Sequence, residues 1–176
     1  GDRKNEMTSQ EVKVDQVDRI VSQWERERPD LDVSPVEIFG RIARVDILLG
    51  KFVNDFLIQH NLTLGLFDVL TALRRSGQPY KLKPSDLADM TMLTSGGITG
   101  RLDQLEELGL VERTTDKRDR RVMFAQLTQE GLSVIDTVIE GHFIREAEVL
   151  EGIPESDRFE LTRLLKILEM VLESRQ

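Results

Sequence analysis

The sequence predicts a mostly α-helical fold with one small β-hairpin, which belongs to the α+β class. Apolar residues recur at every third or fourth position in several long segments, the period of an amphipathic helix. Residues 122–127 instead suit a strand, with Val122 and Phe124 on one face and Met123, Ala125 and Leu127 on the other. No apolar run approaches the length of a membrane span, so we expect no membrane partner.

Two helices are predicted near the N-terminus, over residues 11–28 and 36–59, separated by the proline-containing segment "PDLDVSP". The first helix carries an apolar seam at helical spacing, formed by Val14, Val17, Val21 and Trp24. The second carries a longer stripe, formed by Ile38, Ile42, Val45, Leu49, Phe52 and Phe56. Residues 1–10 are polar and charged, and we expect them to be a loose N-terminus.

Three more helices are predicted in the middle of the chain. Thr63 is placed to cap the first, over residues 64–75, and Pro84 opens the second, which continues to about Met92. The third is predicted over residues 95–108, with inward apolar positions at Ile98, Leu102, Leu105 and Leu108. A turn of three or four residues joins the last two, which is the spacing of a helix-turn-helix.

A hairpin follows directly, with strands in "GLVERTT" and "RRVMFAQLT" on either side of a charged tip. The order of helix-turn-helix and then hairpin predicts a winged helix over residues 63–128. Thr128 is placed to cap a helix that runs to about Leu150, and a last helix carries a stripe of Leu161, Leu164, Leu165, Leu168, Val171 and Leu172. Because these stripes need a partner, we expect the chain to form an oligomer.

Composition excludes several classes of function. The chain has no cysteine and only two histidines, so disulfides, thiol chemistry and Cys-based zinc sites are ruled out, and we expect no metal or cofactor. No nucleophile–base set or phosphate-binding loop is present, so an enzyme is not expected. Without an apolar leader in its first residues, the chain is predicted to be cytoplasmic.

The third central helix has the features of a DNA recognition helix. Its first turns, "TSGGITGRL", hold small or hydroxyl residues, which let the backbone approach the bases or phosphates of a major groove. The predicted DNA-contacting residues there are Ser95, Gly97, Thr99, Gly100 and Arg101. The alternative is that the glycines only permit close helix packing. Three glycines in five residues are costly for an ordinary helix, at about 1 kcal/mol each relative to alanine.

The hairpin tip "DKRDRR" is strongly basic within a chain whose net charge is −8. Basic side chains on a two-stranded finger can enter the minor groove, where negative potential is concentrated, and Lys117, Arg118 and Arg120 are the predicted DNA contacts. Asp116 and Asp119 are expected to shape the tip by capping its backbone and pairing with arginine, and Arg121 to begin the second strand and brace the wing. The alternative is a set of solvated surface charges.

The chain resembles the MarR family of transcriptional regulators. The resemblance is carried by "LTLGLFDVLTALRRSG", by "LKPSDLADMTMLTSGGITGRLDQLEELGLVER" and by the wing "TDKRDRR…LTQEG", and it covers nearly the whole chain. It implies a homodimer with two winged-helix lobes that face double-stranded DNA at a pseudo-palindromic operator. Residues 11–62 and 129–176 are then the dimerisation regions, and residues 11–62 also form a wall of the ligand pocket. The resemblance also implies a repressor that a small molecule releases from the DNA.

A narrower resemblance, to the urate-responsive, PecS-like branch of the family, rests on the long N-terminal helix with "VSQWERERPDLDVSP". In that branch four residue types at matching positions are linked to urate, and here they are Trp24, Asp68, Arg101 and Arg113. Gly100 departs from the branch, in which asparagine tends to precede the arginine.

Each residue of this set also has an ordinary structural interpretation. Trp24 can be a packing anchor on its helix seam, Asp68 can cap a helix or pair with Arg74 or Arg75, and Arg113 can pair across the hairpin. The chemistry nevertheless suits a planar anion, because arginine offers a flat fork of donors and tryptophan an N–H and a flat face.

The sequence and the resemblance therefore predict a ligand-responsive DNA-binding regulator that a small anion such as urate releases from DNA. Two alternatives stay open at this point: a regulator of the same family with a phenolic or carboxylate effector, and a winged-helix protein-interaction module that does not bind DNA.

Overall fold

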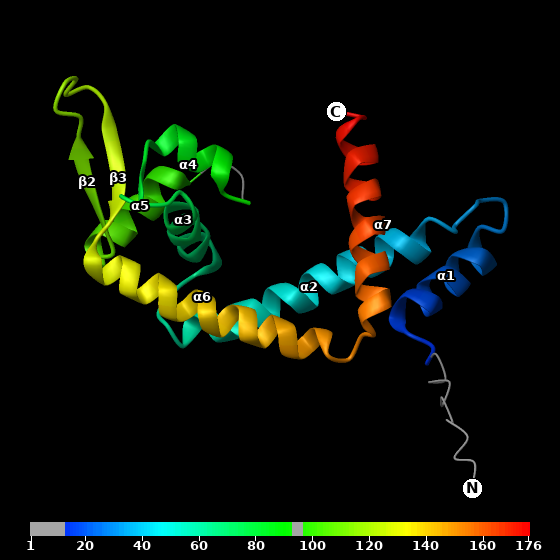
Figure 1. Cartoon of the computed structure of the whole chain (residues 1–176). Helices are drawn as coiled ribbons and strands as arrows, with labels where there is room; N and C mark the ends of the chain where they lie inside the picture. Colours follow the sequence, from blue (N-terminus) through cyan, green and yellow to red (C-terminus); the bar gives the residue numbers. More distant parts are fainter. Residues whose placement is uncertain (1–12, 93–96) are drawn as a thin grey trace, which may run out of the picture. The chain divides into compact units, whose positions relative to one another are not determined.

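The computed structural model describes residues 13–92 and 97–176. Within these ranges the chain forms seven helices and three short strands, so it has the mostly helical α+β fold that the sequence predicts (Figure 1). The expected loose N-terminus, residues 1–10, lies outside the described residues. The chain divides into two compact units, with the boundary between Phe52 and Val53.

The helices and strands agree closely with the predicted segments. The helices are α1 (Gln16–Glu27), α2 (Val36–Ile58), α3 (Leu64–Arg75), α4 (Pro84–Met90), α5 (Ile98–Glu107), α6 (Gln129–Leu150) and α7 (Glu155–Glu173). The strands are β1 (Lys81–Leu82), β2 (Val111–Thr115) and β3 (Met123–Leu127). None of the helices in the described ranges is long and apolar enough to cross a membrane.

Helix α1 of the first unit begins later than predicted. Asp15 caps it, because its side chain accepts from the backbone N–H of Asp18 while Asp18 accepts from that of Asp15, each at 2.9 Å. This reciprocal cap satisfies two N–H groups at the start of the helix. Residues 13–15 are not helical, so the expected start at residue 11 is wrong for them.

The predicted seam of α1 is only partly buried. Val17 and Val21 are buried, whereas Val14 is exposed and Trp24 is 48% exposed. The helix lies close to the start of α2, since a Cβ at Gly40 would be 3.1 Å from Cγ1 of Val17. The expectation that Val14 shares the buried seam is therefore wrong, because it precedes the Asp15 cap and the first helical turn.

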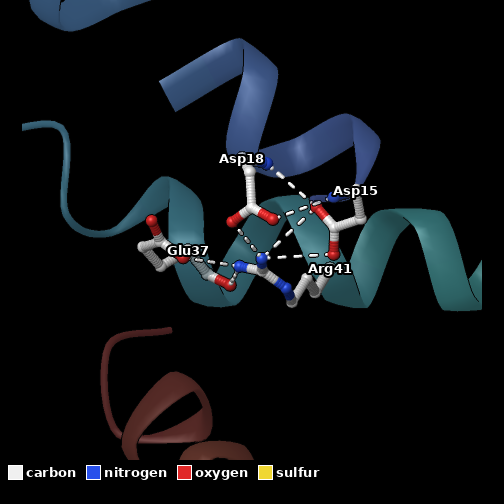
Figure 2. A network of polar contacts seen from close by, with 4 residues as sticks. All are labelled: Asp15, Asp18, Glu37 and Arg41. Carbon is white, nitrogen blue, oxygen red and sulfur yellow. Dashed lines mark hydrogen bonds and ion pairs between the residues drawn. The ribbon is translucent and has the colours of Figure 1, made fainter. Parts of the chain in front are cut away.

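Polar contacts join α1 to α2 around one guanidinium (Figure 2). Arg41 pairs with Asp18 at 2.8 Å, with Asp15 at 3.2 Å and, one helical turn back, with Glu37 at 2.6 Å. The backbone N–H of Asp15 and the Arg41 side chain together hold the pKa of Asp18 below its ordinary value of 3.8. Arg41 thus ties the first turn of α1 to α2 as long as these carboxylates are ionised.

The second unit holds the main hydrophobic core. Helices α3, α4 and α5 pack together, and α3 also packs against α6. Its largest fully buried side chains are Leu57, Val69, Leu70, Leu73, Leu87, Leu102, Leu105, Val111, Ile135 and Val138. The predicted caps of this unit are confirmed, because Thr63 accepts from the N–H of Leu66 at 3.2 Å and Thr128 from that of Gly131 at 3.0 Å.

The sheet has one strand more than predicted, in the order β1-β3-β2 with antiparallel neighbours. Lys81 pairs with Gln126, and Thr114 with Phe124. The sequence gives no sign of β1 because two residues are too few to show alternation. The strand is held by its partner instead, including a hydrogen bond of 3.0 Å from the N–H of Leu127 to the carbonyl of Tyr80.

Helix α7 differs from the other helices of this unit because none of its residues is buried. The predicted stripe is present at helical spacing, but most of its side chains face solvent. Leu161, Leu164, Leu165, Val171 and Leu172 are exposed and Leu168 is half-buried. A row of leucines this long is unusual on a free surface.

Candidate functional site

The helix-turn-helix is formed by α4 and α5, which lie against α3 with the hairpin of β2 and β3 beside them (Figure 1). Helix α4 ends at Met90, two residues earlier than predicted. Leu102 and Leu105 turn one face of α5 into the core. Leu108, predicted to share that face, is 47% exposed because it is the residue that ends the helix.

The start of α5 keeps small residues at the surface. Gly97 precedes the helix with a φ of +89°, a left-handed conformation that glycine adopts without strain. Thr99 and Gly100 are exposed, and a Cβ at Gly100 would meet nothing within 4 Å. Close helix packing therefore does not account for Gly100. Ser95, also predicted to contact DNA, lies outside the described residues.

The wing tip is shaped by its two aspartates, as expected. Oδ1 of Asp116 accepts from the backbone N–H groups of Arg118 at 2.6 Å and Asp119 at 3.2 Å. Oδ1 of Asp119 accepts from the backbone N–H of Arg121 at 3.0 Å and from its Nε at 3.1 Å. The side-chain hydrogen bond from Arg121, together with the one from its backbone, holds the pKa of Asp119 below 3.8.

The basic residues of the tip face solvent. Lys117, Arg118 and Arg120 are exposed, and none of them forms an ion pair within the described ranges. Arg121 does not brace the wing, contrary to expectation. It lies in the turn before β3, its side chain is 92% exposed, and it bonds to Asp119 inside the same tip. The tip therefore presents three cations whose charge is not neutralised locally.

Arg113 joins the wing to the recognition helix. Its Nη1 pairs with Oδ1 of Asp103 at 2.6 Å, and its Nη2 donates to the carbonyl of Thr99 at 3.3 Å. Both partners belong to α5, so the pairing across the hairpin that the sequence left open is not the one observed. These two contacts link β2 to α5.

Arg101 folds back from α5 onto α3. A Cβ placed on Gly65 would be 2.7 Å from Nε of Arg101, so a larger residue at this position would require the Arg101 side chain to shift. The guanidinium also passes Gly97, where a Cβ would be 3.6 Å from Nη2. Nη1 is buried, and no hydrogen-bond acceptor for it exists among the described residues. Leaving a buried N–H of a cation without an acceptor costs free energy.

Asp68 lies one helical turn after Gly65 on α3, on the same face. It is 7% exposed and accepts from the backbone N–H of Met92 at 3.2 Å. Arg74 pairs with Asp136 at 2.6 Å, and Arg75 donates to the carbonyl of Met90 at 2.8 Å. The pairing of Asp68 with Arg74 or Arg75 that the sequence left open is therefore not observed.

Three of the four predicted ligand residues thus lie in the second unit, on the packed elements α3, α5 and β2, whereas Trp24 lies in the first unit. The sequence analysis missed Gly65 and Asp103. A glycine in a first helical turn gives no sign of what fills its space, and an aspartate on a helix surface gives none of its partner across the fold.

A helix-turn-helix with an exposed, small-residue recognition helix and a basic two-stranded wing defines a winged-helix DNA-binding protein. Residues 60–122 match the model of the MarR family. The chain is 37% identical over 154 residues to the HTH-type transcriptional regulator PecS of Dickeya dadantii (strain 3937), covering 88% of this chain and 93% of that protein. It belongs to the MarR family and is a DNA-binding transcriptional regulator, not an enzyme.

Solved structures agree with this assignment. AbsC, a MarR family transcriptional regulator from Streptomyces coelicolor, is 25% identical, with a TM-score of 0.70 over 82% of this chain and 97% of that one. BpsR of Bordetella bronchiseptica, whose DNA binding is regulated by 6-hydroxynicotinic acid, is 20% identical, with a TM-score of 0.65 over 75% and 92% of the two chains. At that identity the second likeness concerns the fold alone.

Proposed function

We propose that the protein is a repressor that binds a pseudo-palindromic operator as a homodimer and leaves it when a small anion binds. The observation that carries the ligand response is the buried Nη1 of Arg101, which lacks an acceptor among the described residues. A planar anion supplies the acceptors that a guanidinium fork requires. In this proposal residues 63–128 bind DNA, and residues 11–62 and 129–176 serve dimerisation.

The DNA contacts come from two elements of the winged lobe. The exposed start of α5, with Gly97, Thr99 and Gly100, lies in the major groove, while Lys117, Arg118 and Arg120 reach the backbone or minor groove. Because the chain carries a net charge of −8, attraction to DNA depends on this local concentration of cations. Ser95 is part of the same proposed contact by its place in the sequence.

Dimerisation is supported by the apolar surface of α7. A second copy that covers the stripe around Leu164, Leu165 and Leu168 removes it from water and places two winged lobes in one particle. Two lobes related by a twofold axis require two half-sites, which is the origin of the pseudo-palindrome.

The ligand acts through Arg101 in this mechanism. Its guanidinium belongs to the recognition helix but rests on α3, next to the face that holds Asp68. An anion that binds Arg101 together with Arg113 pulls on both attachments of α5 and shifts the helix from its DNA-binding position. By linkage, the ligand lowers DNA affinity as far as it prefers the non-binding state.

Urate is the proposed effector because the four residue identities of the PecS-like branch are all present, including Trp24 with its half-exposed indole. Asp68 is suited to accept from ligand N–H groups. A phenolic or carboxylate effector is the alternative within the same mechanism, because it also offers oxygen acceptors to Arg101.

The ligand response is tested by measuring operator affinity with and without millimolar urate. We expect urate to weaken binding by the wild type and to have little effect on Arg101→Ala or Trp24→Ala. Gly65→Ala provides a further test, because it keeps Arg101 but places a methyl group where the Arg101 side chain lies. We expect urate to weaken operator binding by this variant less than by the wild type. Arg19→Ala on the surface of α1 is the matched control.

A wild type whose operator binding is unchanged at millimolar urate would exclude urate as the effector. A panel of aromatic carboxylates and phenols, read by thermal shift and operator release, then distinguishes the alternative effectors.

The DNA contact is tested by the double variant Arg118→Ala plus Arg120→Ala. It removes two cations without disturbing the Asp116 contacts to the tip backbone. We expect weaker operator binding and a smaller salt slope, by about 0.9 for each lost phosphate contact. A salt slope equal to that of the wild type would remove the wing tip from the DNA contact.

A further inference from the structure

A polar hollow lies beside the wing tip, on the outward face of the three-stranded sheet. Its volume is about 450 Å³, and its lining includes Lys81 from β1, Thr114 and Thr115 from β2, Gln126 from β3, and Lys117 and Arg118 from the tip. Lys81 is paired with Gln126 across the sheet. The neighbouring Ala125 points to the opposite face and is buried in the core, so the hollow opens away from it.

The charge of the hollow is positive. Lys81, Lys117 and Arg118 line it, and none of them forms an ion pair within the part of the chain that is described. The only carboxylate of its lining is that of Asp116, whose Oδ1 already accepts from two backbone N–H groups of the tip. The ammonium of Lys81 lies 4.4 Å from the centre of the Phe124 ring, which holds it over the sheet.

Thr114, one of the residues that line the hollow, has a hydrogen-bonding group that is not used within the described residues. Oγ1 of Thr114 is buried, and it has no hydrogen-bond partner among the described residues. Burying a hydroxyl without a partner costs free energy. A hydroxyl donor beside two ammonium groups and a guanidinium is a set that suits the oxygens of a phosphate.

We infer that this hollow binds a phosphate of the operator backbone, with Lys81 and Thr114 as contacts in addition to those of the tip. The inference rests on the proposed DNA contact of the wing. Lys117 and Arg118 belong to both the hollow and the tip, so a tip that enters a groove brings the adjacent phosphodiester to Lys81. Strand β1 therefore extends the DNA contact beyond the hairpin.

The first experiment compares Lys81→Gln with Lys83→Gln in operator binding over a range of salt concentrations. Lys83 is two residues away, exposed, and not part of the lining of the hollow. We expect Lys81→Gln to weaken binding several-fold and to reduce the salt slope by about 0.9 for each subunit, whereas Lys83→Gln behaves as the wild type. Equal slopes for the two variants would overturn the inference.

The second experiment locates the phosphate by replacing single operator phosphates with neutral methylphosphonates. At one position, the replacement should weaken operator binding by the wild type but should not further weaken binding by Lys81→Gln. Thr114→Val keeps the shape of the side chain but removes the hydroxyl. Replacing the same phosphate should therefore lower the operator affinity of this variant less than that of the wild type. Additive losses at every position would place Lys81 away from the backbone.

The alternative ligand for the hollow is a free phosphate compound, which offers the same oxygen acceptors as a DNA phosphate. Inorganic phosphate and pyrophosphate, added at constant ionic strength, should shift the NMR signals of Lys81 and Thr114 only weakly. Tight binding of either compound, with an unchanged salt slope in Lys81→Gln, would overturn the assignment to DNA. If the wild type binds no operator, the proposed function fails as well. If Arg118→Ala plus Arg120→Ala weakens binding but Lys81→Gln does not, only this inference fails.

Discussion

Helices α5 and α7 both carry leucines at helical spacing, but their surroundings differ. Leu102 and Leu105 of α5 are buried by α3 and the sheet, whereas α7 has no buried residue at all. An apolar stripe thus indicates that something covers it, without indicating what. In the winged lobe the stripe of α5 is buried by other elements of the same chain. We propose that the stripe of α7 is buried by a second copy of the chain.

The largest expected effect comes from placing a charge in the α7 stripe. Leu165→Glu should raise the dimer dissociation constant by about 100-fold or more and abolish operator binding, because a carboxylate is costly to bury without a partner. Sedimentation velocity measures the change in mass. Lys166→Glu introduces the same group one position away from the stripe and should remain dimeric. Equal masses for both variants and the wild type would contradict the proposed role of α7.

The next effect concerns the packing that closes the winged lobe. A Cβ on Gly131 would lie 1.9 Å from the carbonyl oxygen of Leu110, so Gly131→Ala must push α6 away from it. We expect the free energy of unfolding to fall by about 3 kcal/mol, measured by urea denaturation.

Gly100→Ala is the control for this change, because its added methyl group meets nothing within 4 Å inside a helix. It should raise the free energy of unfolding by up to about 1 kcal/mol. A similar loss in both variants would show that loss of glycine itself, and not the contact with Leu110, sets the effect.

A smaller effect is expected at a helix cap of the same lobe. Thr63→Ala removes the acceptor for the N–H of Leu66 and should lower the free energy of unfolding by about 1 kcal/mol. Thr137→Ala removes an exposed hydroxyl from the middle of α6 and should change it by less than about 0.5 kcal/mol. Denaturation of the two variants side by side separates the cap from the general effect of losing a hydroxyl.

The smallest effect lies in the first unit and depends on pH. The folded pKa of Asp18 is below 3.8, so the stabilisation it gives is present above about pH 4 and is lost as the pH falls through the folded pKa. Trp24, the only tryptophan, reports the release of α1 by its fluorescence. Asp18→Asn should flatten this acid transition, whereas Asp46→Asn should leave it in place. An unchanged transition in Asp18→Asn would assign the release to other carboxylates.

Local patterns predicted most of the fold. The bounds of α3, the two threonine caps and the hairpin could be located because each depends on residues close together in the sequence. The exposed positions of Leu108 and Arg121 and the strand β1 could not, since each is decided by where a helix ends or by a distant partner. Candidate site residues could be proposed from the sequence. The packing of Arg101 against Gly65 could not be predicted, because the two residues are distant in the sequence.

The Asp116 contacts described for the wing tip have a consequence for the kinetics of encounter. The loop is already ordered by two hydrogen bonds to one oxygen atom, so little conformational freedom is left to lose when the tip meets a duplex. That entropy is spent when the protein folds. In the proposed DNA contact, Arg118 would therefore approach the duplex from a loop that already has its final conformation.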